Sequence, residues 1–214
     1  MVQRATVPRG RHAPPLEIRL SVQRRRLFEA AADVFARIGY AEASAEAIAR
    51  EAGMSKATFY EHFANKEECI LALFDEAATE VLRAMAEAAD AAGLDPRERW
   101  RAGARAFLRM LAEHPAWAQT LLVEVLGAGE CGAERRDSVL ATFADVLDAE
   151  NAAAARAGEV PRFASPHDAF AVVGAGVELV SRQIRLGVPG DVRALEPLLE
   201  RMAAGLLAVP SAKG

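Results

Sequence analysis

The stretch SAEAIAREAGMSKATFYEHFANK, residues 44–66, contains two short helix signals on either side of a glycine. Ser44 is a typical N-cap residue, because its hydroxyl oxygen can accept a hydrogen bond from a free backbone N–H of the first helical turn. Gly53 ends this helix, since glycine tolerates the left-handed conformation of a tight turn. Ser55 then caps a second helix, which runs to Phe63. Two helices joined by so short a turn are predicted to form a helix-turn-helix.

The two faces of this motif differ in chemistry. Apolar residues recur at positions that would pack both helices against a third one, namely Ile48, Ala49, Ala52, Met54, Phe59 and Phe63. The residues left facing outward are Lys56, Ala57, Thr58, Tyr60 and His62. Hydrogen-bond donors, a small side chain and an aromatic hydroxyl suit the base edges and phosphates of a DNA major groove. Tyr60 could instead be a core residue, and Lys56 could simply be solvated.

A third helix precedes the motif and a fourth follows it. Apolar residues at helical spacing predict the preceding helix over about residues 20–38, ending at Gly39. The following helix begins at Lys66, where the lysine charge and the free N–H groups of the first turn could bind a phosphate.

Residues 40–68, with the helix before them, resemble the DNA-binding domain of the TetR family of transcriptional repressors. The positions that carry this resemblance are Phe35, Gly39, Tyr40, Ser44, Ile48, Ala49, Ala52, Gly53, Met54, Ser55, Thr58, Phe59, Tyr60, His62, Phe63, Lys66 and Glu67. The resemblance implies that residues 55–63 are the recognition helix, and Ala45 departs from the commoner valine. The DNA-contacting residues expected from the pattern and the resemblance are Ser44, Glu46, Ser55, Lys56, Ala57, Thr58, Tyr60, His62 and Lys66.

The distribution of charge agrees with a DNA-binding module at the front of the chain. Residues 1–66 carry 11 Lys and Arg against 7 Asp and Glu, a net charge of +4, while the rest carries 15 against 23, a net charge of −8. Residues 1–18 hold three prolines and a glycine and are predicted to be a disordered arm. Its arginines could serve solubility or could contact DNA phosphates or the minor groove.

The composition favours an all-α fold of about nine helices. We divide the chain into the arm, a helix-turn-helix DNA-binding domain over 19–66, and a helical ligand-binding and dimerisation domain over 67–214. The helices expected in this last part cover about residues 67–92, 97–111, 116–126, 138–157, 166–186 and 191–208. Pro197 either kinks the last of these or lies in its true first turn.

Residues 127–137 are predicted to form a loop, and their glycines match the pattern G-x-G-x-x-G. A dinucleotide site would also need a preceding strand in a βαβ unit, and the neighbouring segments are helical. The sequence contains no P-loop, no Ser/His/Asp arrangement and no His or Cys pair at metal-ligand spacing, so we expect neither an enzyme, nor a cofactor, nor a metal site. The two cysteines predict no disulfide framework.

The two C-terminal helices are more apolar than one small domain requires. The resemblance implies that the helices over 166–186 and 191–208 pair with their copies in a homodimer, and a symmetric pair of motifs would match the two half-sites of a double-stranded DNA operator. No segment has the length of a signal peptide core or of a membrane span, so we expect a cytoplasmic protein without membrane contact.

The function expected from these observations is a ligand-responsive transcription regulator, most simply a repressor that a small, hydrophobic effector releases from its operator. Candidate effector contacts, for each of which an ordinary core or surface residue is the alternative, are Trp100, Phe107, Met110, Trp117, Glu124, Phe143, Phe170 and Glu178. An activator built on the same module remains open. The alternative from another class is an all-helical dimeric adaptor without sequence-specific DNA binding.

Overall fold

The computed structural model describes residues 15–207, apart from the side chains of Pro166 and Leu207. Over these residues the fold is all-α, and the prediction of the fold class is confirmed. The described elements, in order, are α1 Leu16–Glu42, α2 Ala45–Glu51, α3 Lys56–His62, α4 Lys66–Ala91, α5 Pro96–Glu113, α6 Pro115–Leu122, the 3-10 turn η1 Glu124–Ala128, α7 Gly129–Arg156, α8 Pro166–Leu186, the 3-10 turn η2 Val192–Leu195 and α9 Glu196–Leu207.

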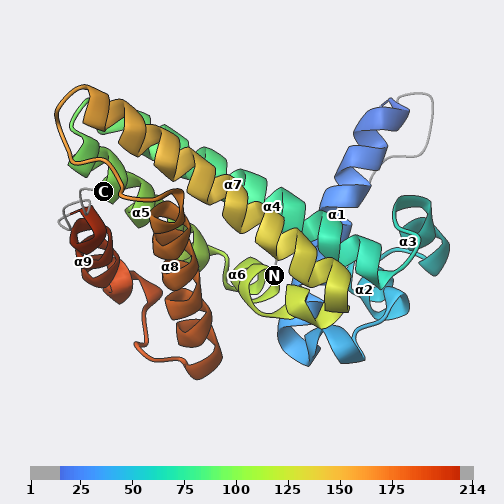
Figure 1. Cartoon of the computed structure of the whole chain (residues 1–214). Helices are drawn as coiled ribbons and strands as arrows, with labels where there is room; N and C mark the ends of the chain where they lie inside the picture. Colours follow the sequence, from blue (N-terminus) through green and yellow to red (C-terminus); the bar gives the residue numbers. More distant parts are fainter. Residues whose placement is uncertain (1–14, 208–214) are drawn as a thin grey trace.

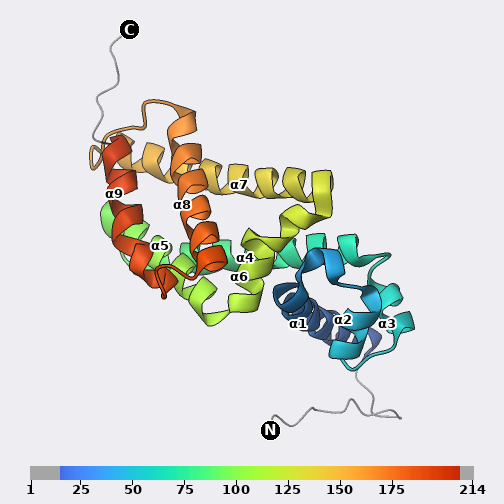
Figure 2. The same cartoon turned by 90° about the horizontal axis from the view of Figure 1, so that it is seen from below.

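The long helix α4 connects the two parts of the molecule. Figure 1 shows α1, α2 and α3 gathered at one end, α4 and α7 running along the molecule, and α8 and α9 at the far end. Figure 2, turned by 90°, shows the same separation of α1–α3 from α8 and α9. The helix-turn-helix and the two C-terminal helices are therefore held at opposite ends of one helical frame.

Two hydrophobic cores correspond to these two parts. The first joins α1, α2 and α3 to the beginning of α4, where Cys69, Ile70 and Leu73 are buried. The second joins the middle of α4, from Phe74 to Val81, to α5, α6, α8, η2 and α9. Since one continuous helix supplies residues to both cores, a displacement of α4 is felt in both. The proposed boundary between residues 66 and 67 remains a prediction.

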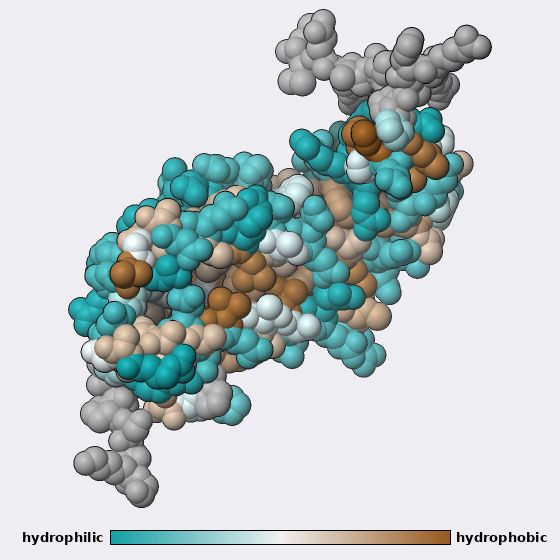
Figure 3. Space-filling model, turned by 90° about the horizontal axis from the view of Figure 1, so that it is seen from above, coloured by the Kyte–Doolittle hydropathy of each residue, from teal (hydrophilic) through white to brown (hydrophobic). Residues whose placement is uncertain are grey.

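Helix α1 is longer than the sequence indicated. It begins at Leu16, directly after Pro15, so residues 16–18 form its first turn and are not part of a disordered arm. The first turns expose Leu16, Ile18, Leu20 and Val22. Figure 3 shows brown, hydrophobic surface at the upper right end of the molecule. The other residues of the predicted arm, 1–14, lie outside the described part of the chain.

The other end of α1 does not stop at Gly39. This glycine has φ 78° and ψ 160°, a conformation that breaks the helix locally, and the chain then makes one more helical turn to Glu42. The prediction was therefore correct that Gly39 interrupts the helix and wrong that the helix ends there.

The loop predicted over residues 127–137 is wrong. The turn η1 runs to Ala128, and α7 begins at Gly129 and continues without interruption to Arg156. Predicted helix 116–126 accordingly divides into α6 and η1. Three glycines suggested a loop, but the residues between and after them are mostly good helix formers, and no strand precedes them among residues 15–207. The G-x-G-x-x-G match is thus part of a helix start.

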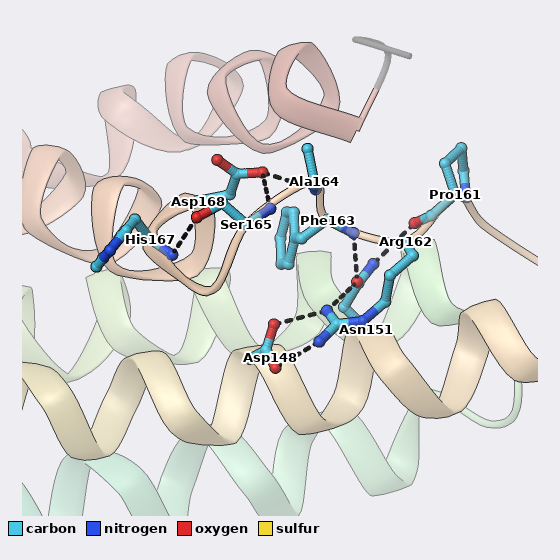
Figure 4. A network of polar contacts seen from close by, with 9 residues as sticks. All are labelled: Asp148, Asn151, Pro161, Arg162, Phe163, Ala164, Ser165, His167 and Asp168. Carbon is cyan, nitrogen blue, oxygen red and sulfur yellow. Dashed lines mark hydrogen bonds and ion pairs between the residues drawn. The ribbon is translucent and has the colours of Figure 1, made fainter. Parts of the chain in front are cut away.

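A polar network fixes the entry into α8, as Figure 4 shows. The buried Asn151 of α7 accepts a hydrogen bond from the Phe163 N–H and donates one to the Pro161 carbonyl, at 2.9 and 3.0 Å. Arg162 forms two 2.6 Å hydrogen bonds with Asp148. Ser165 then caps α8 in a reciprocal capping box with Asp168. Helix α8 starts and ends where the sequence predicted, at residues 166 and 186.

The last predicted helix resolves one of the two alternatives for Pro197. The turn η2 occupies residues 192–195, and α9 begins at Glu196, so Pro197 lies in the first turn of α9. A proline is tolerated there because the first N–H groups of a helix have no intrahelical partner.

Neither cysteine is part of a disulfide, and burial raises the pKa of the Cys69 thiol to about 12, so this residue is an inert core residue. No helix within residues 15–207 combines the length and the apolar character that a bilayer crossing requires.

Candidate nucleic-acid interface

The helix-turn-helix is held by the caps that the sequence predicted. Ser44 Oγ accepts a hydrogen bond from the Ala47 N–H at 3.1 Å, and Ser55 Oγ accepts one from the Thr58 N–H at 3.0 Å. Gly53 between them has φ 67°. Helices α2 and α3 therefore meet through a turn whose geometry needs glycine, and each begins at a serine.

The inner face of α3 is fixed by aromatic packing. Phe59 and Phe63 are 0% and 1% exposed, and their ring centroids are 5.5 Å apart. Phe28 of α1 lies 5.6 Å from Phe63, and the Arg24 guanidinium lies over both of these rings. This packing leaves α3 only one free face, because the inward side is closed by α1.

The outer face of α3 presents the residues predicted to contact DNA. Lys56, Ala57 and Tyr60 are exposed, and Tyr60 keeps 50% of its surface accessible while its ring stands perpendicular to that of Phe59. The Thr58 hydroxyl is half-buried and shares a 3.0 Å hydrogen bond with Ser55. The structure thus brings these side chains together on one surface, and their contacts with DNA remain predictions.

Glu46 and Lys56 face each other across the turn. The Lys56 ammonium and the Glu46 carboxylate are 3.8 Å apart, and both side chains are mostly exposed. An exposed ion pair of this kind contributes only about 0–1 kcal/mol. A phosphate could therefore replace Glu46 as the partner of Lys56 at little cost.

His62 lies between α3 and α1. Its Nε2 is 3.4 Å from the Gln23 side-chain oxygen, and partial burial followed by the charge of Arg24 lowers the pKa of His62 below 6.5. This shift favours the neutral imidazole. The predicted contact of His62 with a phosphate would be a hydrogen bond from a neutral ring and not an ion pair.

Lys66 has a structural role that the sequence did not reveal. Its ammonium donates hydrogen bonds to the carbonyl oxygens of Tyr40, Ala41 and Ala43 at 2.8, 3.0 and 3.0 Å. It also lies 4.5 Å from the centroid of the Tyr40 ring. All three ammonium donors are thus used to close the carbonyl end of α1, where free carbonyls favour a cation. This arrangement disfavours the phosphate contact predicted for the Lys66 side chain.

Glu124 has a structural role of the same kind. One oxygen of its carboxylate accepts a hydrogen bond from the Tyr40 N–H and the other from the Gln119 amide, each at 2.8 Å. The Tyr40 N–H is free for this bond because Gly39 breaks α1 at that point. Glu124 therefore ties η1 to the end of α1, and it is not placed as the effector anchor that the sequence suggested.

The remaining candidate effector contacts fall into different places. Four of them are partly buried and pack against the second core, namely Phe107, Met110, Trp117 and Phe143. Trp100 carries a buried indole N–H that has no acceptor among the described residues. Phe170 and Glu178 lie on the exposed side of α8, where Glu178 pairs with Arg185 at 2.9 Å. The eight candidates are therefore not gathered around a single site.

A cleft of about 780 Å³ lies elsewhere, between α1 and the C-terminal part. Its walls come from α1 with Asp33 and Arg37, from the junction of α5 and α6, and from the segment between α8 and η2 with Asp191 and Arg193. None of the candidate effector contacts lines it. Each arginine already pairs with a carboxylate, Arg37 with Glu51 and Arg193 with Asp191.

One further side chain was missed by sequence reasoning. Arg136 of α7 is half-buried, and its Nε atom is buried without a hydrogen-bond partner in the described part of the chain. In the sequence it stands in the segment ERRD, which reads as a solvated run of charges. Its place on the inner face of α7 separates it from the other charges of this segment. The sequence did not predict that face, because the predicted helix began only at residue 138.

Comparisons with known proteins agree with this geometry. Residues 27–73 match the family model of bacterial regulatory proteins, tetR family. In Mycolicibacterium smegmatis, the HTH-type transcriptional regulator EthR is 32% identical over 80 residues, 37% of this chain and 37% of EthR. The HTH-type transcriptional activator FasR of the same organism is 33% identical over 102 residues, 48% of this chain and 46% of FasR. The chain thus matches less than half the length of either relative.

The likeness of the fold extends over nearly the whole chain. The crystal structure of the transcriptional regulator FadR from Bacillus subtilis, in complex with stearoyl-CoA, is 20% identical. It superposes with a TM-score of 0.75 over 86% of this chain and 97% of its own length. At this identity the comparison shows a common fold.

A helix-turn-helix followed by an all-helical body is the architecture that this chain shares with the solved transcription regulator. The match over residues 27–73 places the helix-turn-helix of this chain with the DNA-binding domains of the tetR family of bacterial regulatory proteins, as the resemblance of residues 40–68 implied.

Proposed function

We propose that the protein binds operator DNA through the outer face of α3. The observation that carries this proposal is the contrast between the two faces of that helix: Phe59 and Phe63 are fully buried, while Lys56, Ala57 and Tyr60 are exposed beside them. A short helix with a free polar and aromatic face, preceded by a supporting helix, has the form that enters a major groove. The basic N-terminal third supplies the attraction to phosphates.

Replacing Tyr60 with alanine is expected to weaken operator binding about 10-fold or more, because a base or phosphate contact contributes about 1–3 kcal/mol. The DNA probes for this test are the region upstream of the coding sequence of this protein and sites selected from a random-sequence pool. Fluorescence anisotropy at about 50 and about 200 mM salt measures affinity and its salt dependence, since phosphate contacts weaken steeply over this range.

The control for this experiment is Leu94→Ala, because Leu94 is 90% exposed in the turn between α4 and α5, far from the interface. It should bind like the wild type. If no DNA from the selected pool is preferred over random sequence, the operator proposal is wrong and the adaptor alternative takes its place.

We infer that two copies pair through α8 and α9, which places two recognition helices on one operator. The exposed side of α8 carries Phe170, which is 38% exposed, with the small residues Ala171, Gly174 and Ala175 beside it. A Cβ added at Gly174 would meet nothing within 4 Å in the single chain. A second helix can therefore approach this surface closely.

Ala175→Arg is expected to raise the dissociation constant of the dimer at least about 10-fold, because each pair of subunits would bring two new like charges together. Sedimentation velocity over a range of protein concentrations measures this. The matched control is Ala86→Arg, which adds the same charge at an exposed position of α4. Equal dimerisation of the two variants would contradict pairing through α8.

We further propose that the protein is a repressor and that a small apolar effector, bound in the C-terminal domain, releases it from DNA. FadR of B. subtilis was crystallised with stearoyl-CoA, which supports an effector with an apolar chain. The relative FasR is named an activator, so the sign of regulation is the first thing for a reporter assay to determine. The effector needs only to prefer one conformation of the dimer by a few kcal/mol. In that conformation the spacing of the two helix-turn-helix motifs does not fit the operator.

The contacts around Tyr40 give such an effector a route to the DNA-binding domain. Glu124 in η1 holds the Tyr40 N–H, and Lys66 at the start of α4 holds the Tyr40 carbonyl. A displacement of η1 or α4 therefore acts directly on the end of α1, which packs against α2 and α3. This chain of contacts supports coupling between the two cores.

A further inference from the structure

The cleft of about 780 Å³ between α1 and the C-terminal part is bounded by elements of both cores. Helix α1 belongs to the first core, and the second core contributes Leu111, Ala118 and Val192 to the opposite walls. Sites for small molecules commonly have volumes of about 300–1,000 Å³. A ligand in this cleft would therefore contact the helix-turn-helix part and the C-terminal part at the same time.

The charged side chains in the walls of the cleft differ in their partners. Arg37 pairs with Glu51 at 2.9 Å, and Arg193 pairs with Asp191 at 2.7 Å. Asp33 is exposed, and within the described part of the chain its carboxylate has neither an ion pair nor a hydrogen bond. Both cations of the walls thus have their counter-charge, and the carboxylate of Asp33 is left for a ligand.

Two glutamines supply uncharged acceptors to the same cleft. The Gln119 amide nitrogen donates to a Glu124 carboxylate oxygen at 2.8 Å, and the Gln183 amide nitrogen donates to the Pro189 carbonyl at 2.9 Å. Because a carboxylate and a carbonyl only accept, these bonds fix the orientation of both amides. Neither amide oxygen has a donor among the described residues, and neither is buried without a partner, so both remain accessible.

The walls therefore offer hydrogen-bond acceptors and one unpaired negative charge. A primary ammonium group is the complement of such a surface, because it carries a positive charge and three N–H donors and has no acceptor. An anionic ligand would meet the Asp33 carboxylate while both arginines are already paired. The rest of the lining is mostly aliphatic, with Leu111, Pro115 and Ile184 and several alanines, and suits a short apolar body.

We propose that this cleft binds a small organic cation, a primary amine with a short apolar body, and that Asp33 is its counter-charge. The site is separate from the effector site proposed for the C-terminal domain, because none of the candidate effector contacts lines the cleft. Gln119 in its wall also donates to Glu124, which accepts from the Tyr40 N–H. A bound amine would thus lie next to the contacts that tie η1 to α1, and would hold α1 against the C-terminal part.

Isothermal titration calorimetry on the full chain without DNA tests the proposal. The three probes are phenylbutylamine, phenylbutanol and phenylbutyrate, which share an apolar body and differ in the charge of the head group. The amine is expected to bind with a dissociation constant of about 1 mM or lower, and at least about 10-fold more tightly than the alcohol and the carboxylate.

Three variants locate the binding. Asp33→Asn keeps the size of the side chain and removes its charge, so the amine should bind within about 3-fold of the alcohol. The matched control is Asp145→Asn, which removes the same charge from an exposed position of α7 outside the cleft and should bind like the wild type. Ala36→Phe places a ring in the cleft and should weaken the binding of the amine and the alcohol alike.

The proposal is overturned if the alcohol or the carboxylate binds as tightly as the amine, if the amine does not bind, or if Asp33→Asn keeps the preference. Equal losses in Asp33→Asn and Asp145→Asn would also overturn it, since they would mean a general attraction of cations to a chain of net charge −4. An unfolded Ala36→Phe leaves the comparison of the two asparagine variants decisive. The titration contains no DNA, so its outcome is independent of the operator proposal, which the anisotropy experiment with Tyr60→Ala tests.

Discussion

Phe59→Ala should lower the stability of the protein by about 3–5 kcal/mol, the usual cost of emptying a buried phenylalanine site. Phe59 is fully buried in the first core, beside Phe63 and in the same cluster as Ile48 and Phe35. In a chain of this size that loss corresponds to a decrease in melting temperature of roughly 6–20 °C. Thermal unfolding followed by circular dichroism measures it, and operator binding should be lost with the fold of α3.

The neighbouring residue provides the contrast that makes this result informative. Tyr60 is half exposed, so Tyr60→Ala should change stability by only about 0.5 kcal/mol while weakening DNA binding. Phe59→Leu, which refills most of the site, should recover the greater part of the melting temperature. If Phe59→Ala melted like the wild type, or if Tyr60→Ala lost as much stability as Phe59→Ala, the assignment of inner and outer faces of α3 would be wrong.

The helix-turn-helix could be predicted from the sequence because its determinants are local. Ser44 and Ser55 cap the helices that follow them, and Gly53 takes the left-handed turn, all within a few residues of the groups they serve. The spacing of Phe59 and Phe63 fixes which side of α3 is buried. The residues on the opposite side follow from this geometry alone.

The roles of Lys66 and Glu124 could not be predicted in the same way. Each binds backbone groups near Tyr40, and the partners of Glu124 and Lys66 are 84 and 26 residues away in sequence. In the sequence, a lysine at a helix start and an acid in an apolar segment both suggest ligand contacts. Only the folded chain shows that the lysine already binds the free carbonyls at the end of α1 and that the acid already binds a free N–H there.

The effector site could not be predicted from the sequence for a related reason. Aromatic and apolar residues at helical spacing line a pocket and fill a core with the same periodicity, so Phe107, Met110 and Phe143 could not be distinguished from core residues. Arg136 reads as one charge in a charged run, and its partial burial depends on which face of α7 it occupies. Once α7 is known to begin at Gly129, the position of Arg136 on the inner face of this helix follows.

The glycine pattern that suggested a loop leads to the second large prediction. Gly132→Ala should destabilise the protein by roughly 2–3 kcal/mol, because a Cβ at this position would collide with the Val125 carbonyl oxygen. That oxygen belongs to the backbone of η1 and cannot rotate away, and the Ala128 side chain closes the site from another side. The melting temperature should fall by about 4–12 °C, as measured by differential scanning calorimetry.

Gly103→Ala is the matched control, because Gly103 is also buried and helical. A Cβ there would lie 3.6 Å from the Met85 carbonyl oxygen, an ordinary contact, so the substitution should be neutral or should stabilise α5 by up to about 1 kcal/mol. Equal melting temperatures for the two variants would mean that η1 yields easily to α7. Since η1 carries Glu124, a yielding η1 would also be unable to transmit a displacement to the end of α1, and coupling between the two cores would then depend on α4 alone.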